Sequence, residues 1–488
     1  MSQRDSNSKP LNFRDIAFGY SSAEAERSND PGLLLEGHID FKASSEEALH
    51  GAKYLFLGYK GAGKSSIAER IALTHSSRSD FVKSLSLAEF PFTPFSRVIR
   101  GDAEPEAKFP TAWSWIILIY VLESMARDKD IRLTDRNAFE DSIKAFREMG
   151  LSPAAEPGGI VRMSAKNNFR LSLPGKLAEF SWSGSETKPA SDIPDFVESL
   201  KGLVRGVRGD NMHYLLIDGL DDVLTTREVQ YKSLAALIFE VGRLNLDFKN
   251  NRVPVKIILL CRTDLYERIP GANKNKTRQD HAVELDWYHD PREPRQSALI
   301  EIANVRASRS LKVRTDLFDT FFPTEIDNTD VRRYLLEMTR HTPRDFLRLL
   351  FHIQEFSSVG RLSVGAIKSG LRDYSIKYFL PEIQDELSGY ATPDEISRMI
   401  SALGRLRKRD FKLAELIDAS GTSNKSLPAE RVHEIVEALF NCSALGNIQH
   451  RRGGTTYYTF KYRNRHSSFN EGESIMLHRG LWKSLNVI

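Results

Sequence analysis

The chain has little of what marks secreted, membrane-spanning or zinc-binding proteins. Among its 488 residues only Cys261 and Cys442 are cysteines, too few for a disulfide framework or for paired zinc ligands. The longest apolar run, Trp113 to Leu122, is about half as long as a membrane-spanning helix requires. The residues before Leu11 are polar and lack the apolar core of a signal peptide. We therefore expect a protein of the reducing cytoplasm that does not enter the membrane.

The signatures of several hydrolase classes are also missing. The 12 histidines are scattered without H-E-x-x-H spacing, and no G-x-S-x-G turn is present, which argues against a zinc protease or a serine hydrolase. The sequence has no repeat of fixed period and no heptad array. A chain of this length exceeds a single hydrophobic core, so roughly two to four domains are expected.

What the chain does have is a glycine-rich segment that matches G-x-x-x-x-G-K-[ST]. The apolar run Tyr54–Leu57 precedes it, and a helix-like stretch from Ser66 to Leu73 follows. In a phosphate-binding loop, glycines let backbone N–H groups surround an anion, and the next helix N-terminus adds partial positive charge. Lys64 is predicted to reach the β- and γ-phosphates of ATP, and Ser65 to hold Mg²⁺. The predicted nucleotide-binding residues are Gly58, Tyr59, Lys60, Gly61, Ala62, Gly63, Lys64, Ser65 and Ser66.

A second signal is the apolar run from His213 to Ile217, which stops at Asp218. A continuous apolar run is typical of a strand buried on both faces, so Asp218 is predicted to emerge at the carboxyl edge of a parallel sheet, where ligands bind. There it would hold Mg²⁺ as a Walker B aspartate does, while Asp221 or Asp222 orients or deprotonates the attacking water. The alternative is a strand followed by an Asx turn, because Asp-Gly is a common turn dipeptide.

A third apolar run, Val255–Leu260, is predicted to lie beside the Walker B strand and leads into Cys261-Arg262-Thr263-Asp264. That position would bring Arg262 or Thr263 to the γ-phosphate. The alternative is that Arg262 forms an ion pair with a nearby carboxylate, such as Asp264 or Glu267.

Further along, Pro343 falls at a predicted helix start, which is its favoured position. Arg344 follows in the first turn, where a cation opposes the helix dipole. An anionic partner such as a phosphate would explain this unfavourable placement.

In this order the motifs resemble those of the AAA+ and STAND branches of the P-loop ATPases. Leu216–Asp222 is similar to the NACHT-type Walker B pattern, and Thr342–Arg344 to the lid proline and sensor-2 arginine of origin-recognition-type ATPases. Most of the chain also resembles a bacterial set of stand-alone P-loop ATPases with a Phe-Gly and an Ala-Glu-x-Glu signature, here Phe18-Gly19 and Ala23–Glu26, and with a basic aromatic C-terminus, here Tyr457–Asn464.

The resemblance implies an ATPase that requires ATP and Mg²⁺, and a gene context in bacterial antiviral defence or mobile elements. The chain departs from the pattern at Asp222, where a catalytic Glu is usual. A shorter side chain puts the base further from the water, so the resemblance implies slow or partner-stimulated hydrolysis. Arg306 and Arg278 are the arginines considered for a trans-acting role.

The expected fold class is α/β: a P-loop core with a parallel sheet, followed by an α-helical lid and a C-terminal winged helix. Core strands are predicted near Tyr54, Leu85, Tyr214, Ile257 and Val283, and a β-hairpin near Phe169–Leu173. The predicted parts are 1–50 as tail and lead-in segment near the adenine, 51–290 as the core with an insertion at about 128–210, 291–379 as the lid and 380–488 as the winged-helix-like domain.

The winged-helix prediction rests on three helical stretches followed by two strands around a Gly-Gly turn. From His450 to His466 the sequence has five Lys and Arg, no acidic residue and four aromatic residues, a composition suited to phosphate contact and base stacking. Winged helices also serve as protein interfaces, so this part binds either nucleic acid or protein. The basic residues proposed to form one face are Arg451, Arg452, Lys461, Arg463 and Arg465.

Two classes of function remain. One is a nucleotide-controlled switch that assembles with itself or with an effector protein and turns over ATP mainly to reset. The other is a motor or loader that hydrolyses ATP on DNA or RNA. The missing catalytic Glu and the absence of a recognisable effector module favour the switch.

Overall fold

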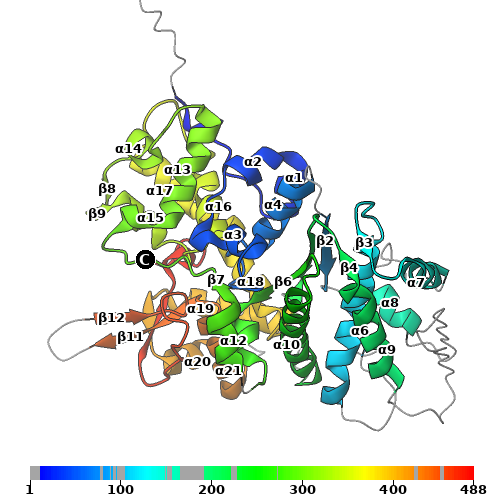
Figure 1. Ribbon diagram of the computed structural model, residues 1–488. Coiled ribbons are helices and arrows are strands. Elements are labelled where there is room, and N and C mark those ends of the chain that lie inside the picture. The colour runs from blue at the N-terminus through cyan, green and yellow to red at the C-terminus, as the bar shows by residue number, and fades with distance from the viewer. Residues whose placement is uncertain are drawn as a thin grey trace, which may run out of the picture. The chain divides into compact units, whose positions relative to one another are not determined.

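The computed structural model divides the chain into two compact units. The core unit comprises Asp40–Lys60 and Lys64–Leu285, and the lid unit comprises Met1–Ile39, Gly61–Gly63 and Asp286–Ile488. Figure 1 labels their helices and strands. The residues that the structure describes are 11–76, 81–87, 90–91, 95, 105–148, 150, 157–164, 192–220, 228–271, 273–421, 427–450 and 456–487.

The core unit is built on a five-stranded parallel sheet with the order β2-β5-β6-β1-β7. The central strands β1, β5 and β6 are mainly apolar and buried, whereas the edge strand β2 is half polar and has one buried residue. The sequence prediction of an α/β core with five strands at these places is confirmed. The strands are β1 (Leu55–Gly58), β2 (Phe81–Ser86), β5 (His213–Asp218), β6 (Val255–Arg262) and β7 (Ala282–Glu284).

Helices cover this sheet and complete its hydrophobic core. The long apolar helix α6 packs against β5, α9 and α10, and α10 also packs against β6. Residues 115–122 of α6 are all buried, which explains why a run too short for a membrane is apolar on every side. Among the described residues, no helix is long and apolar enough to cross a membrane. The principal helices are α4 (Lys64–Ser76), α6 (Pro105–Met125), α9 (Asp192–Arg205), α10 (Glu228–Asn250), α11 (Thr263–Arg268) and α12 (Lys274–His281).

The predicted insertion at 128–210 contains helices and a short antiparallel pair, β3 with β4. Phe139, Ile143 and Phe146 share the buried face of α7, as the 3.6-residue period requires. The predicted hairpin at 169–173 lies outside the described residues. The elements here are β3 (Arg132–Leu133), α7 (Arg136–Glu148), α8 (Pro157–Ser164) and β4 (Val207–Arg208).

Lys256 of β6 connects the segment before the P-loop to the sheet. Its Nζ donates to the carbonyls of Glu47 and Gly51, both at 2.7 Å. Glu47 lies in the last turn of α3 (Ser44–Leu49) and Gly51 follows the helix, and the helix dipole favours a cation at this end. Burial lowers the pKa of Lys256 to about 8.

The lid unit begins with an N-terminal segment that packs on its helices. Gln354 donates to the carbonyls of Phe13 and Ile16 at 2.7 and 2.8 Å. The predicted lead-in segment is therefore split, with residues up to Ile39 in the lid unit and the remainder in the core unit. The N-terminal elements are η1 (Phe13–Asp15), α1 (Ala23–Asn29) and α2 (Pro31–Glu36).

The helices of the lid follow the predicted order. A continuous helical stretch runs through α17, η5 and α18, and the predicted boundary at 379–380 falls within it. Residues 375–379 form one π-helical turn that ends two residues before Pro381, which has no N–H for the α-helical ladder. The elements are η4 (Pro294–Gln296), α13 (Ala298–Leu311), α14 (Leu317–Phe321), β8 (Glu325–Ile326), β9 (Thr329–Asp330), α15 (Val331–Leu336), α16 (Pro343–Gln354), α17 (Val364–Tyr374), η5 (Ser375–Phe379) and α18 (Leu380–Leu387).

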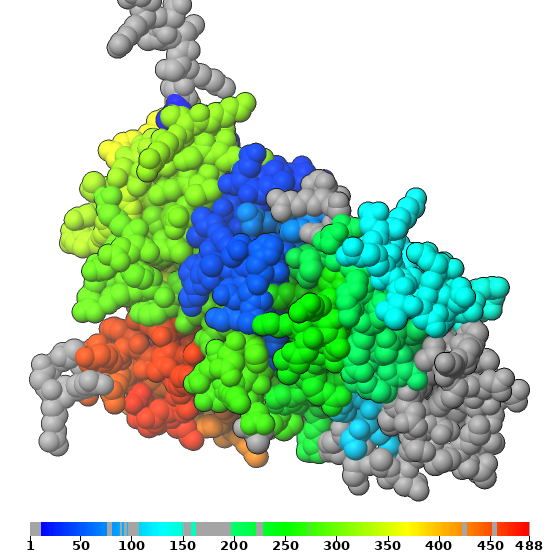
Figure 2. Space-filling view, viewed as in Figure 1, coloured from blue at the N-terminus to red at the C-terminus, as the bar shows by residue number. Residues whose placement is uncertain are grey.

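The C-terminal part of the lid unit has the three helices and the hairpin that were predicted from the sequence. Its antiparallel sheet has the order β10-β13-β11-β12, so β13 separates β10 from the hairpin; neither β10 nor β13 was predicted. Figure 2 shows the described part of this region, orange to red, as a closely packed surface. The elements are α19 (Pro393–Leu406), β10 (Asp410–Phe411), α20 (Leu413–Gly421), α21 (Ala429–Asn441), β11 (Leu445–His450), β12 (Thr456–Thr459), β13 (Ser474–Leu477) and η6 (Arg479–Leu481).

Candidate nucleotide-binding site

The glycine-rich segment forms a turn between β1 and α4. Gly61 and Gly63 have φ of +80° and +93°, a left-handed conformation that side chains disfavour and glycine adopts without cost. Lys64, the first residue of α4, is buried, and its Nζ donates to the carbonyls of Gly58 at 3.1 Å and Tyr59 at 3.3 Å. The lysine thus folds back over the turn that precedes its own helix.

The next residue of α4 meets the end of β5. The hydroxyl of Ser65 donates to Oδ2 of Asp218 at 2.8 Å, although 153 positions separate the two residues. Parallel strands bring their carboxyl ends to one edge of the sheet, and Asp218 is the last residue of its strand. The core unit has a P-loop fold. Its two predicted Mg²⁺ ligands are hydrogen-bonded to each other, and paired hydroxyl and carboxylate oxygens are the donor type that Mg²⁺ prefers.

Asp218 also accepts a hydrogen bond from the residue that follows it. Its Oδ1 accepts from the backbone N–H of Gly219 at 2.7 Å, and Gly219 has φ +81°. This bond and the contact with Ser65 use different carboxylate oxygens, so they are compatible. Asp221 and Asp222, predicted to activate the water, lie outside the described residues.

Arg262 lies at the end of β6, beside β5 as predicted. Its guanidinium forms two hydrogen bonds with the carboxylate of Asp264, at 2.9 and 2.7 Å. Burial raises the pKa of Asp264, but Arg262, Arg268 and Lys64 outweigh that effect, and the net pKa lies below its usual value. The ion-pair alternative for Arg262 is therefore what the structure contains, while Thr263 is buried at the start of α11.

Arg344 lies in the first turn of α16. Thr342 caps this helix, because its hydroxyl accepts from the N–H of Asp345 at 3.2 Å, and Pro343 occupies the first position. The N–H of Arg344 donates to the carbonyl of Gly61 at 3.3 Å. Its guanidinium lies 3.4 Å from Oε1 of Glu382 on α18. The anionic partner of Arg344 in the structure is thus a carboxylate of the same unit. A contact with a phosphate stays a prediction.

A cluster of ion-paired residues that the sequence analysis did not predict connects α16 to α18. Arg340 is buried and binds Asp345, next to Arg344, and Glu386, one turn after Glu382. The hydroxyl of Tyr378 also donates to Asp345 at 2.9 Å. These residues come from four different positions along the lid, and no local sequence pattern predicts that they lie together.

The two arginines considered for a trans-acting role are both held inside their own chain. Arg306 is buried and pairs with Glu26 at 2.7 Å. Arg278 pairs with Glu284 at 2.6 Å, and 12% of its side chain is exposed. Both guanidinium groups thus form ion pairs within the chain, and a trans-acting role for either arginine stays a prediction.

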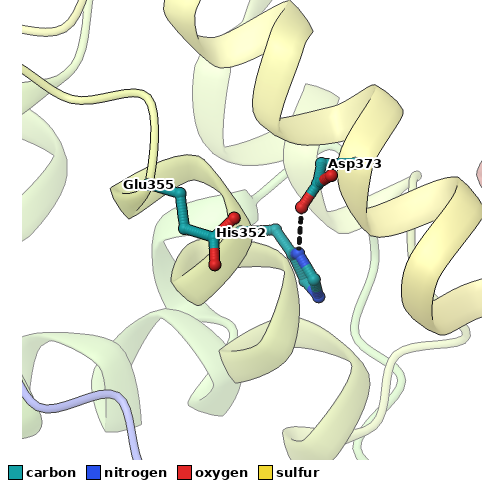
Figure 3. Close-up of side chains that lie close together, drawn as sticks. All are labelled: His352, Glu355 and Asp373. Atoms are coloured by element: carbon teal, nitrogen blue, oxygen red, sulfur yellow. Dashed lines mark hydrogen bonds and ion pairs between the residues drawn. The ribbon is translucent and has the colours of Figure 1, made fainter.

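One cluster in the lid unit has residue types that could bind a metal ion. His352, Glu355 and Asp373 lie close together, and Figure 3 shows His352 Nδ1 hydrogen-bonded to Asp373, at 2.8 Å. Lys377 already places its Nζ 2.7 Å from Asp373 and 4.0 Å from Glu355. A cation of the chain thus already pairs with Asp373, and we interpret the cluster as an ion-pair group.

The predicted basic face is only partly within the described residues. Arg451 and Arg452 lie outside them. Lys461 donates to the carbonyl of Ser467 at 2.9 Å. Arg463 donates to the hydroxyl of Tyr462 at 3.1 Å and lies over the ring of Phe460, while Arg465 is half-buried. Arg463 therefore packs on aromatic rings of its own domain.

Comparisons with known proteins match part of the chain to a family and most of it to distant structures. A family model described as the FunZ-associated C-terminal helical domain matches residues 297–380, which run from the residue before α13 to the first residue of α18. No curated protein matches.

Among solved structures, the chain is similar to a Walker-type ATPase of Pyrococcus abyssi, with 12% identity, 87% of this chain and 94% of that chain covered, and a TM-score of 0.36. It is also similar to the Orc1 protein of Aeropyrum pernix in complex with DNA, with 12% identity, 92% and 91% covered, and a TM-score of 0.37. A third is the RuvB Holliday junction branch migration motor of Thermotoga maritima, with 13% identity, 88% and 95% covered, and a TM-score of 0.30. At this level of similarity these structures establish no activity for the chain.

Proposed function

We propose that this protein is an AAA+/STAND-type P-loop ATPase that binds and hydrolyses ATP and acts as a nucleotide-controlled switch in an assembly. The contact between Ser65 and Asp218, directly after a glycine-rich turn that ends in Lys64, is the observation that carries the proposal. It places a hydroxyl and a carboxylate beside the helix N-terminus where phosphates bind.

In this proposal the residues have separate roles. Backbone N–H groups from Gly58 to Ser66 surround the phosphates, and Lys64 contacts the β- and γ-phosphates. Ser65 and Asp218 hold Mg²⁺, which when bound neutralises the charge that develops on the transferred phosphoryl group. Asp222, or Asp221, orients the water. Arg262 and Arg344 are the sensor residues.

The switch is favoured over the motor by how the sensor arginines are held. Arg262 and Arg344 each face a carboxylate, Asp264 and Glu382, so their charges are already partly neutralised. Such a site is suited to slow, partner-stimulated turnover, in line with Asp222 at the place of the usual Glu. The proposed partner is a second copy of the chain or an effector protein, and the proposed setting is bacterial antiviral defence in the cytoplasm.

The test of the proposed chemistry separates binding from hydrolysis. We expect Asp222→Asn to retain ATP affinity and lose turnover, because the amide cannot accept the proton of the water. Asp218→Asn should instead weaken the Mg²⁺-dependent part of ATP binding. Turnover is measured as phosphate release, and affinity by calorimetric titration with and without Mg²⁺. Normal hydrolysis by Asp222→Asn together with loss in Asp221→Asn would place the base at Asp221.

The second candidate is a nucleic-acid-dependent ATPase that binds DNA or RNA through the C-terminal hairpin. It is supported by Tyr457 and Tyr458, which are 46% and 44% exposed on β12, the edge strand of its sheet. Exposed aromatic rings on an edge strand can stack on bases. A rise in ATP turnover on adding DNA or RNA would favour this function over the switch.

The salt dependence of duplex binding tests the same candidate. If Arg451 and Arg452 contact phosphates, replacing both with alanine should reduce the slope of log affinity against log salt by roughly 2, since each contact contributes about 0.9. Affinity should fall about equally for all sequences. The measurement is a fluorescence anisotropy titration at several salt concentrations. An unchanged slope in the double variant would assign this domain to protein contact.

A further inference from the structure

The contact between Arg344 and Glu382 limits how freely the guanidinium of Arg344 can bind a phosphate. The backbone of Arg344 lies against Gly61 of the same unit, because its N–H donates to the carbonyl of Gly61. A Cβ placed on Gly61 would lie 3.1 Å from Cβ of Arg344. The base of this side chain therefore lies close to Gly61, while its guanidinium faces Glu382 of α18.

Glu382 is held where it can compete for that guanidinium. It lies in the first turn of α18 and is 14% exposed, whereas Arg344 is 30% exposed. Arg340 bridges Asp345 and Glu386, the neighbours of Arg344 and Glu382 on the two helices. Because this bridge is buried, α18 cannot move away from α16 without breaking a buried ion-pair network, and that is costly.

We propose that Glu382 is a positioning residue that withholds Arg344 from the nucleotide. A guanidinium has five donors in one plane, and the Nη1 group that faces Glu382 at 3.4 Å cannot serve a phosphate at the same time. To recruit this group, ATP displaces the carboxylate or shares the guanidinium with it, and part of its binding energy is used for that exchange. This inference rests on the proposed function, because it requires a phosphate at the loop.

Glu382→Gln tests the proposal, since it keeps the shape of the side chain and removes its charge. We expect the affinity for ATP·Mg²⁺ to rise roughly threefold to fivefold, the range for a partly exposed ion pair. Affinity is measured by isothermal titration calorimetry on the full chain, and thermal unfolding checks that each variant is folded. Asp385→Asn, on the exposed side of the same helix, is the matched control and should bind ATP as the unmodified chain does.

A double-variant cycle separates this mechanism from a general effect of charge. If Glu382 acts through Arg344, then Glu382→Gln should have no effect on ATP affinity in the Arg344→Ala background. A gain that persists in that background, or no gain in the unmodified background, would overturn the proposal. If the proposed function itself is wrong, the unmodified chain will bind no ATP. That result differs from the two above and would also remove the basis of this inference.

Discussion

Replacing Lys64 with alanine is expected to abolish the stabilisation of the protein by ATP·Mg²⁺. Lys64 is 4% exposed, and its ammonium is held over the turn by the carbonyls of Gly58 and Tyr59. It is thus fixed before any ligand arrives, and little side-chain freedom would be lost on binding a phosphate. At a ligand concentration a hundredfold above the dissociation constant, the unmodified chain should gain about 2.7 kcal/mol.

The measurement is the shift in melting temperature when ATP and Mg²⁺ are added. Lys64 also holds two backbone carbonyls, so Lys64→Ala is expected to lower the melting temperature without ligand. Each variant is therefore compared with itself, before and after addition of ATP. Lys249→Ala, an exposed lysine near the end of α10 in the same unit, is the control and should keep the full shift. No shift in the unmodified chain, or an equal shift in Lys64→Ala, would refute the assignment of the loop.

The core unit was predictable because its signals are local and strong. The central strands β1, β5 and β6 are mainly runs of apolar residues next to a turn or a helix start, and a parallel sheet places the ends of such runs at one edge. The sequence therefore predicted that Ser65 and Asp218 would come to the same edge, and the structure joins them. The prediction did not require knowing the strand order, only that β1 and β5 run in the same direction.

The side-chain partners of the sensor arginines were less predictable. Arg262 has Asp264 two residues away and Glu267 on the next turn, and only the backbone at the start of α11 decides between them. Glu382 follows Arg344 by 38 positions, so no helical or strand period connects them. Their contact depends on the ion pairs by which Arg340 joins Asp345 of α16 to Glu386 of α18, and these form only in the folded lid.

The N-terminal residues that were identified only through the family resemblance form a buried contact with the lid. The Phe-Gly and Ala-Glu-x-Glu signatures come together because Arg306 of α13 binds the carbonyl of Phe18 at 2.6 Å and the carboxylate of Glu26. Gly19 has φ +99°, and a Cβ there would lie 2.0 Å from Nη1 of Arg306. Residues of both signatures therefore hold the N-terminal segment against the lid helices through their contacts with Arg306.

This contact leads to a large expected effect on stability. We expect Glu26→Ala to lower the free energy of unfolding of the lid unit by about 3–5 kcal/mol, because it leaves a buried guanidinium without its counter-charge. Arg306 and Glu26 are only 7% and 6% exposed, and the remaining partners of Arg306, the carbonyls of Phe18 and Gly37, carry no charge. The measurement is chemical denaturation followed by far-UV circular dichroism.

Arg309, one turn further along α13, provides the control. It pairs with Asp30 and Glu36 in the same N-terminal segment, but 23% of its side chain is exposed. Arg309→Ala should therefore cost at most about 1 kcal/mol, as exposed ion pairs do. Replacing Glu26 and Arg306 together with leucine should recover part of the loss, because neither variant side chain leaves a buried charge. If Glu26→Ala costs no more than Arg309→Ala, the buried pair does not hold the segment, and the aromatic packing of Phe13 on Phe321 and Phe322 must do so instead.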